Sequence, residues 1–223
     1  MRLAIVMPTL DEEAALDRSL PAALALADEV VVSDGGSGDR TLEIARRHGA
    51  RVVCGPPGRG GQLNRGAAAA TSDLLLFLHA DTVLPPGAGR LVRDAAAKGA
   101  EFGAFALRFD DGRPIYRLAA RLINLRTRLT RLPLGDQAHF VTRAAFERLG
   151  GFRDWPILED LDLAWRARRE TRVTLIDQAV LTAARRYVER GFFRTASTNW
   201  LIWVLFALRV SPHRLARLYR QIR

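Results

Sequence analysis

Short apolar runs alternate with segments of helical periodicity along the first 82 residues. Apolar runs at 3–7, 29–33, 51–54 and up to residue 78 predict four buried strands. Between them, residues 11–27 and 39–48 and an alanine-rich segment ending at residue 70 predict three helices. This alternation predicts an α/β fold with a mostly parallel central sheet flanked by helices.

The pattern is less regular after residue 83. Residues 85–98 and 158–169 predict helices, 101–109 alternate like an exposed strand, and 138–142 predict a strand. Residues 115–131 predict an amphipathic helix with leucines on one side and arginines largely on another: Leu118, Leu122 and Leu125 against Arg117, Arg121 and Arg128. We expect one α/β domain over residues 1–185, with halves 1–82 and 83–185, followed by a basic amphipathic helical segment over 186–223.

Positive charge is concentrated in two segments. The net charge is +10, yet residues 185–223 hold nine arginines and one acid, and residues 113–131 hold six arginines and no acid. The other 165 residues therefore sum to −4. Such clustering favours phosphate-bearing substrates or an anionic membrane surface as partners.

Cysteine usage and the first residues indicate the compartment. Cys54 is the single cysteine, which excludes an internal disulfide and favours a reducing environment. The opening apolar stretch is too short for a secretory signal and is followed by a Pro-Thr turn and three acids. We expect the chain in the cytoplasm.

The C-terminal apolar run, residues 200–208, leaves two explanations open. Its nine residues are too few to span a bilayer, which takes roughly 20. A helix apolar all round is usually buried core or a contact between copies of a homo-oligomer, and this explanation is favoured. The alternative is peripheral attachment to the inner face of the membrane, with tryptophans at headgroup level and arginines on anionic lipid.

An acidic residue follows the fourth predicted strand. Asp81 comes shortly after the run that ends at Leu78, and ligands of open α/β sheets gather at the carboxyl ends of the strands. A carboxylate there suits Mg²⁺ or Mn²⁺ held against a diphosphate. His79 lies two residues earlier and faces the same side of an extended segment, so it is a second candidate ligand; a structural role is the alternative.

Three further segments carry candidate chemistry. The glycine-rich turn at 34–39 lets a ligand approach the backbone, and Asp34 can accept hydrogen bonds from a base or ribose; an ordinary turn is the alternative. The loop at 58–64 places Arg59 beside free amides, a phosphate-binding arrangement, or a solvated loop. Glu159 and Asp160 open a helix, where a carboxylate can serve as general base or only complement the helix dipole. Neither glycine-rich segment has the spacing of a dinucleotide fingerprint or a Walker A loop.

Four motifs in this order resemble the family 2 glycosyltransferases of the GT-A fold: Met-Pro-Thr-Leu-Asp-Glu-Glu at 7–13, Ser-Asp-Gly-Gly-Ser-Gly-Asp at 33–39, His-Ala-Asp at 79–81 and Glu-Asp at 159–160. The resemblance implies an inverting transferase that uses a UDP- or GDP-linked sugar and Mn²⁺ or Mg²⁺. It implies Asp160 as the catalytic base with Glu159 in support, and Asp81, joined by His79, at the metal. The implied nucleotide-sugar contacts are Pro8, Thr9, Leu10, Glu12, Asp34, Gly35, Arg59, Gln62 and Asp81.

The sequence departs from the family pattern at two positions and also resembles a narrower group. His79 replaces the first Asp of Asp-x-Asp, and Gly35 replaces the second Asp of Asp-Asp-Gly-Ser. His-Ala-Asp-Thr at 79–82, Gly-Asp-Gln-Ala at 135–138 and Val-Ser-Pro-His-Arg-Leu at 210–215 are similar to a compact bacterial subgroup labelled arsenosugar-biosynthesis or radical-SAM and selenodomain-associated glycosyltransferases. In that comparison Asp136 and Gln137 lie on the acceptor side.

Two other classes compete with this interpretation. A sugar-phosphate nucleotidyltransferase would carry a glycine-rich loop with a basic residue after the first strand, where this chain has Pro-Thr-Leu-Asp-Glu-Glu. A non-catalytic lipid- or RNA-binding module on a degenerate fold would explain the arginines but not the three acids Asp34, Asp81 and Asp160. The aromatic and basic residues are not interleaved as in nucleic-acid platforms, so we expect no nucleic-acid partner.

Overall fold

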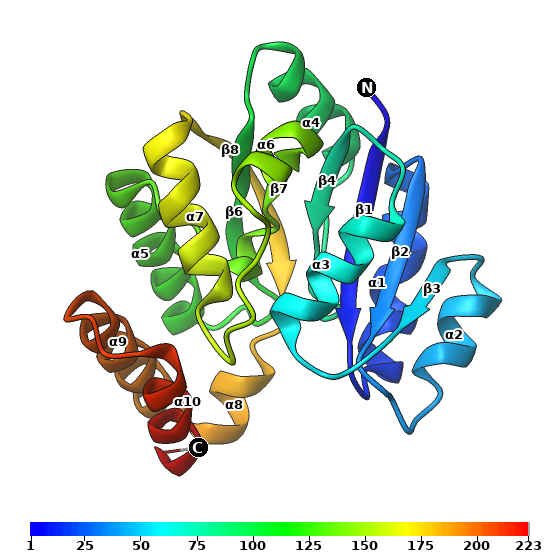
Figure 1. Cartoon of the computed structure of the whole chain (residues 1–223). Coiled ribbons are helices and arrows are strands. Elements are labelled where there is room, and N and C mark those ends of the chain that lie inside the picture. Colours follow the sequence, from blue (N-terminus) through cyan, green and yellow to red (C-terminus); the bar gives the residue numbers. More distant parts are fainter. Residues whose placement is uncertain (223) are drawn as a thin grey trace.

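The core of the protein is an eight-stranded sheet in the order β3-β2-β1-β4-β7-β6-β8-β5 (Figure 1). The computed structural model describes residues 1–222, with the side chains of residues 186, 189, 190 and 220–222 left out; Arg223, the end of the predicted C-terminal segment, lies outside the described residues. Strands β3, β2, β1 and β4 are parallel, β7 runs antiparallel to both neighbours, and β5 pairs antiparallel with β8. The predicted fold class, a mostly parallel sheet flanked by helices with a helical C-terminal segment, is confirmed.

The elements of the first half follow the predicted alternation closely. They are β1 (Leu3–Thr9), α1 (Glu13–Leu26), β2 (Glu29–Asp34), α2 (Thr41–Arg47), β3 (Arg51–Cys54), α3 (Arg59–Ala69) and β4 (Leu74–Phe77). The second half contains β5 (Thr82–Val83), α4 (Ala88–Ala97), β6 (Phe102–Phe109), α5 (Pro114–Thr130), the 3₁₀ turn η1 (Gly135–Gln137), β7 (Phe140–Thr142), α6 (Arg143–Arg148), α7 (Glu159–Glu170) and β8 (Val173–Thr182). Helices α8 (Arg185–Arg190), α9 (Phe192–Ala207) and α10 (Pro212–Ile222) complete it.

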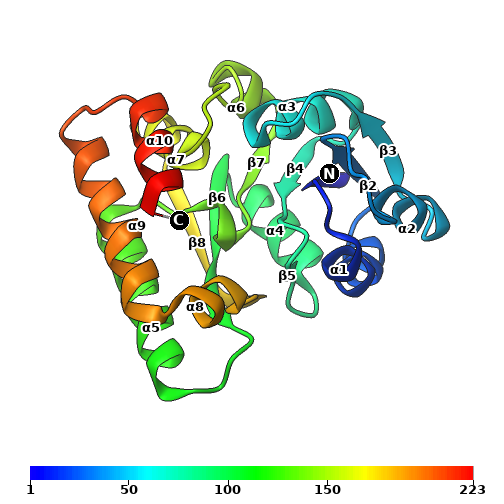
Figure 2. The same cartoon turned by 90° about the horizontal axis from the view of Figure 1, so that it is seen from below.

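The sheet is buried on both faces, which explains why its strands are continuous apolar runs. Alternate residues of β1 enter different layers: Leu3, Ile5 and Met7 pack with the helices α1 and α4, whereas Ala4 and Val6 pack with α3 and α7. The view along the sheet in Figure 2 shows α1 and α4 on one side and α3, α6 and α7 on the other. The sheet is therefore supported by packed helices on both faces.

Strand β6 corrects the expectation of an exposed strand at 101–109. It lies inside the sheet between β7 and β8, and six of its eight residues are buried, all except Ala106 and Arg108. Its far end is covered by a third apolar cluster that includes Tyr116 and Ala120 of α5. An alternating pattern cannot reveal which later helices will cover the second face.

Helix α5 also differs from the expectation for its leucines. Its buried side is formed by Tyr116, Ala120 and Thr127, which face β6. The amide of Asn124 pairs with both backbone groups of Leu107, at 2.9 and 3.0 Å. The leucines predicted as one face of the amphipathic helix are exposed, and so is the row of arginines beside them.

The C-terminal apolar run is only partly buried. In α9 Thr198 and Ile202 are buried, and Trp203 and Phe206 pack partly against the second apolar cluster, whereas Trp200 and Leu208 are largely exposed. The core explanation favoured from the sequence therefore holds for one side of the helix and not for the run as a whole. Within the described part of the chain, no helix has both the length and the apolar character needed to cross a membrane.

Arg143, at the start of α6, ties that helix to the end of α3 and the link that follows it. Its guanidinium donates to the carbonyl oxygens of Ser72 at 2.9 Å, Ala70 at 2.8 Å and Ala67 at 3.2 Å. We expect Arg143→Met to lower the free energy of unfolding by about 3 kcal/mol, because three carbonyls lose a charged donor. Urea denaturation followed by circular dichroism measures this change.

Arg148 on the same helix is the matched control. It pairs only with exposed carboxylates, Glu101 at 3.0 Å and Glu170 at 3.5 Å. Arg148→Met should cost less than ~1 kcal/mol, as is usual for surface ion pairs. Equal losses in the two variants would contradict the role given to Arg143.

Candidate functional site

The predicted site residues gather at the carboxyl edge of the sheet. The ends of β1 and β2 lie side by side, with Thr9 paired to Asp34, and β4 runs beside β1 on its other side. The loop after β4 carries His79 and Asp81, and η1 and the N-terminus of α7 complete the edge. Figure 2 looks onto this edge.

Asp34 organises the glycine-rich turn. Its carboxylate accepts hydrogen bonds from the Thr9 hydroxyl at 3.1 Å, from the backbone of Gly36 at 2.7 Å and Ser37 at 2.8 Å, and from the Ser37 hydroxyl at 2.5 Å. Burial raises the pKa of Asp34, but these donors outweigh it and the net pKa is lowered. The carboxylate therefore fixes the shape of the turn, and the exposed Leu10 lies beside it.

Gln62 and Arg59 connect helix α3 to the site. The buried Gln62 amide donates to the carbonyls of Thr9 at 2.7 Å and Ser33 at 3.0 Å, and its oxygen accepts from Gly58 N at 3.2 Å. Arg59 forms an ion pair with Glu159, whose side chain is buried. This pair joins the N-termini of α3 and α7 and holds the positive charge of Arg59 near Asp160.

Asp160 is held by two backbone amides. One carboxylate oxygen accepts from Gly135 N at 2.6 Å and the other from Leu161 N at 2.8 Å. Burial raises the pKa of Asp160, but the Arg59 charge, His139 and the two amides together bring it below its ordinary value. The residue is therefore ionised at neutral pH and able to accept a proton.

Asp136 has the opposite electrostatic environment. Burial raises its pKa to about 6, the Arg126 charge opposes this rise, and the negative charges of Asp160 and Asp81 add to it. One of its carboxylate oxygens is buried without a hydrogen-bond partner among the described groups. Such an oxygen is suited to a hydroxyl group or a cation supplied by a ligand.

His79 and Asp81 lie in the same part of the site as Asp160. A Cβ atom built on Gly135 would lie 2.9 Å from Asp160 Oδ2 and 3.1 Å from His79 Nε2, so both atoms adjoin this glycine. Asp81 is close enough for its charge to affect Asp136. No cluster of three or more His, Cys, Asp or Glu side chains with metal-binding geometry occurs in the described residues, so a cation here would need oxygens from its ligand. The carboxylates and the unpartnered Asp136 oxygen fit Mg²⁺ or Mn²⁺.

Two residues of this site were not predicted from the sequence. Arg126 of α5 is the arginine of its helix that turns inward; its charge acts on Asp136 and Asp160, and its guanidinium lies 5.9 Å from the Trp203 ring. The sequence signal that could have identified Arg126 is its helical position, which lies off the row formed by Arg117, Arg121 and Arg128. His139 is buried, and burial lowers its pKa, so it is neutral at pH 7.

Gln137 is engaged within the protein. Its oxygen accepts from Thr127 Oγ1 at 2.9 Å and Leu134 N at 3.2 Å, and its nitrogen donates to the Phe105 carbonyl at 3.2 Å. The side chain is buried. Gln137 therefore anchors η1 within the protein. Its neighbour Asp136 is the residue whose side chain interacts with Asp160 and Asp81.

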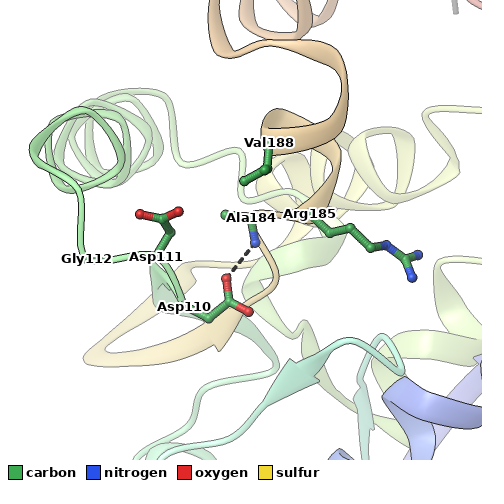
Figure 3. A pocket seen from close by; sticks show the side chains of 6 residues that line it. All are labelled: Asp110, Asp111, Gly112, Ala184, Arg185 and Val188. Carbon is green, nitrogen blue, oxygen red and sulfur yellow. Dashed lines mark hydrogen bonds between the residues drawn. The ribbon is translucent and has the colours of Figure 1, made fainter.

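A cavity of about 550 Å³ adjoins the loop that carries Asp81, and it is lined by Asp110, Asp111, Gly112, Ala184, Arg185 and Val188 (Figure 3). Ala184 N donates to the Asp110 carboxylate at 2.8 Å, and Ala183 N donates to the Asp81 carbonyl at 3.2 Å. In Figure 3 the Asp111 carboxylate and Val188 face the cavity, and Arg185 points away from it. The cavity offers carboxylate oxygens beside the loop that carries Asp81.

The raised pKa of Asp136 has a cost in stability. Since the folded state binds this proton more tightly than the unfolded state, stability falls as pH rises from the ordinary value of 3.8 through about 6. We expect Asp136→Asn to be more stable than the unaltered chain at pH 8 by up to ~3 kcal/mol, and the gain to shrink towards pH 5. Urea denaturation in a chelator, repeated across this range, measures it.

Asp177→Asn is the control for a surface carboxylate. Asp177 is 81% exposed and pairs with Arg128 at 2.8 Å, so its substitution should change stability by less than ~1 kcal/mol at every pH. A gain for Asp136→Asn that does not vary with pH would show that ionisation is not its cause.

Sequence comparisons identify relatives of the same class. The family model described as Glycosyl transferase family 2 matches residues 4–150. An uncharacterized glycosyltransferase of Mycobacterium tuberculosis is 38% identical over 89 residues, and glucosyl-3-phosphoglycerate synthase of the same species is 34% identical over 96 residues. These stretches cover 38% and 37% of this chain and 39% and 30% of the relatives, so the chain matches well under half of their length.

Solved structures share the fold at low sequence identity. Mannosyltransferase PcManGT from Pyrobaculum calidifontis, in complex with GDP-Man and Mn²⁺, has a TM-score of 0.70 and 19% identity, covering 98% of this chain and 68% of that one. TarS of S. aureus, in complex with UDP, has a TM-score of 0.63 and 21% identity, covering 82% and 60%. Glucosyl-3-phosphoglycerate synthase from Mycobacterium tuberculosis, in complex with Mn²⁺, UDP and glucosyl-3-phosphoglycerate, has a TM-score of 0.59 and 23% identity, covering 80% of this chain and 70% of that one.

Of the families that the sequence left open, the match favours the glycosyltransferases over the nucleotidyltransferases. It ends at residue 150, before Glu159 and Asp160. The chain belongs to glycosyl transferase family 2.

Proposed function

We propose that the protein transfers a glycosyl group, with inversion, from a UDP- or GDP-linked sugar to a hydroxyl group of the acceptor, with Asp160 as general base. The observation that supports this most is the position of Asp160: ionised, held by Gly135 N and Leu161 N, and beside His79 and Asp136. In a single-step inverting transfer, the acceptor oxygen attacks the anomeric carbon, its proton passes to Asp160, and the nucleoside diphosphate leaves. A positioned base of this kind contributes on the order of 10²–10⁴-fold to the rate.

The donor is proposed to lie along the ends of β1 and β2. Pro8, Thr9, Leu10, Glu12 and Gly35 border this part of the edge, and Asp34 and Gln62 hold the turn in shape. The exposed Leu10 offers an apolar surface to a base. Arg59, partly exposed, brings positive charge towards the diphosphate while it stays paired with Glu159.

The metal site is proposed at Asp81, with His79 as the second ligand. Mn²⁺ or Mg²⁺, when bound, neutralises charge on the diphosphate leaving group. Its oxygen-rich surroundings include Asp136, whose carboxylate is placed to orient the acceptor hydroxyl. The cavity beside Asp110 and Asp111 is where we place the rest of a polyhydroxylated acceptor. The narrower likeness to the arsenosugar-biosynthesis subgroup stays a prediction carried by residues 79–82, 135–138 and 210–215.

Substitutions at the three acids separate their roles. Asp160→Asn should lower the rate of transfer by 10²-fold or more and leave the thermal shift by UDP or GDP with Mn²⁺ unchanged. Asp81→Asn should abolish the metal-dependent part of that shift. Asp136→Asn should mainly raise the KM for the acceptor. Turnover that survives in Asp160→Asn but not in Asp136→Asn would reverse the assignment of the base.

Gly135→Ala tests the geometry around Asp160. A methyl group there would meet Asp160 Oδ2 at 2.9 Å and the His79 ring at 3.1 Å, so the carboxylate must move. We expect a loss of turnover of at least tenfold with an unfolding midpoint close to that of the unaltered chain, because a 1 Å displacement of a catalytic group is costly. Nucleoside diphosphate release measures turnover.

Gly61→Ala is the matched control, because nothing lies within 4 Å of the Cβ atom it would add. It sits in α3, where alanine favours the helix by up to ~1 kcal/mol. Its activity should be unchanged. If Gly135→Ala were equally active, Asp160 would tolerate displacement, which argues against its role as base.

A further inference from the structure

Two neighbouring helices expose apolar side chains in rows. On α5, Leu118, Leu122, Leu125 and Leu129 follow helical spacing i, i+4, i+7 and i+11, and each is between 51% and 75% exposed. On α9, Phe193, Trp200, Leu201 and Leu208 are between 38% and 79% exposed. We refer to these eight side chains as the apolar face.

Both rows point away from the domain. The opposite sides of the two helices are buried, at Tyr116, Ala120 and Thr127 on α5 and at Thr198 and Ile202 on α9. The helices touch through Tyr116 and Phe192, whose ring centroids are 5.7 Å apart, and through Arg126 and Trp203. Figures 1 and 2 both show α5 and α9 side by side at one end of the molecule, remote from β1–β3. Apolar side chains gathered in this way on a folded surface mark an interaction site.

The charge around the apolar face selects the partner. Arg117, Arg121 and Arg128 form a row along α5 directly beside the leucines, and all three are exposed. The segments that contain α5 and α8–α10 carry +6 and +8, whereas the rest of the chain sums to −4. Leucines and aromatic residues bordered by arginines are the composition of surfaces that lie in the headgroup region of anionic bilayers. A second copy of this chain would place the same arginines against each other, which is unfavourable.

We propose that the apolar face and its arginine row dock the enzyme on an anionic lipid surface, with the leucines, Phe193 and Trp200 entering the headgroup region. The surface is separate from the donor site, so it binds whether or not the proposed transfer reaction is correct. Docking adds no membrane-spanning element; it holds α5 and α9 in the plane of the interface.

Co-sedimentation with lipid vesicles tests the proposal. We expect the protein to bind mixed phosphatidylcholine–phosphatidylglycerol vesicles at low salt, to dissociate at high salt, and to bind phosphatidylcholine alone at least tenfold more weakly. Leu122→Gln with Leu125→Gln, and separately Trp200→Gln, should each weaken binding several-fold, because apolar contact is lost from different helices. Arg117→Gln with Arg121→Gln should weaken it and reduce its salt dependence.

Matched variants and a second measurement keep the test decisive. Arg18→Gln with Arg46→Gln removes the same charge from exposed positions of α1 and α2, and it should bind vesicles like the unaltered chain. Circular dichroism melting should show the same Tm for every variant, since only exposed side chains change. Equal binding to neutral and anionic vesicles, or leucine variants that bind normally, would overturn the proposal. If light scattering instead showed that these variants convert a dimer to a monomer without changing vesicle binding, that result would also overturn the proposal. The apolar face would then be an interface between copies of the chain.

Discussion

The whole arrangement depends on keeping several carboxylates together at one buried edge of the sheet. Burial, together with the negative charges of Asp160 and Asp81, raises the pKa of Asp136 to about 6. Arg59 and Arg126 supply the opposing charge from two different helices, and backbone amides of Gly135 and Leu161 stabilise the ionised form of Asp160. Gathering these acids at one edge lowers the stability of the fold. The different environments of Asp136 and Asp160 move their pKa values in opposite directions, so the two acids can take different roles.

The supports come from elements far apart in sequence. Helix α3 contributes Arg59, which pairs with Glu159 of α7 one hundred residues later, and Asn64 of α3 exchanges two hydrogen bonds, at 2.8 and 2.9 Å, with the backbone of Phe152. Gln62 connects the same helix to the ends of β1 and β2. Helix α3 is therefore fixed against both the ends of β1 and β2 and the start of α7, so that a ligand binding at this edge would lose less entropy in ordering it.

Sequence pattern predicted the first half well because each of its strands is followed by the helix that covers it, and local periodicity carries the information. It did not predict β8, which reaches β6 only through long-range pairing, and it took β6 for an exposed strand. The individual acids were found from motifs, and the structure brings Asp81, Asp136, Asp160 and His79 together. Arg126 was missed although it lies off the row of the other three arginines of α5, because its contact with the buried acids arises from tertiary packing.

Helices α5 and α9 are each used on two sides, and this links the site to the surface of the molecule. Arg126 and Trp203 turn inward, where the arginine charge acts on Asp136 and Asp160, whereas Leu125, one residue before Arg126, belongs to the apolar face. An arginine that stabilises buried acids cannot leave its place without exposing their repulsion, so α5 is held in register by the site itself. The orientation of the outer leucines is thus fixed by the same electrostatic constraint that holds the acids at the edge of the sheet, and a lipid surface bound there would meet a preformed face.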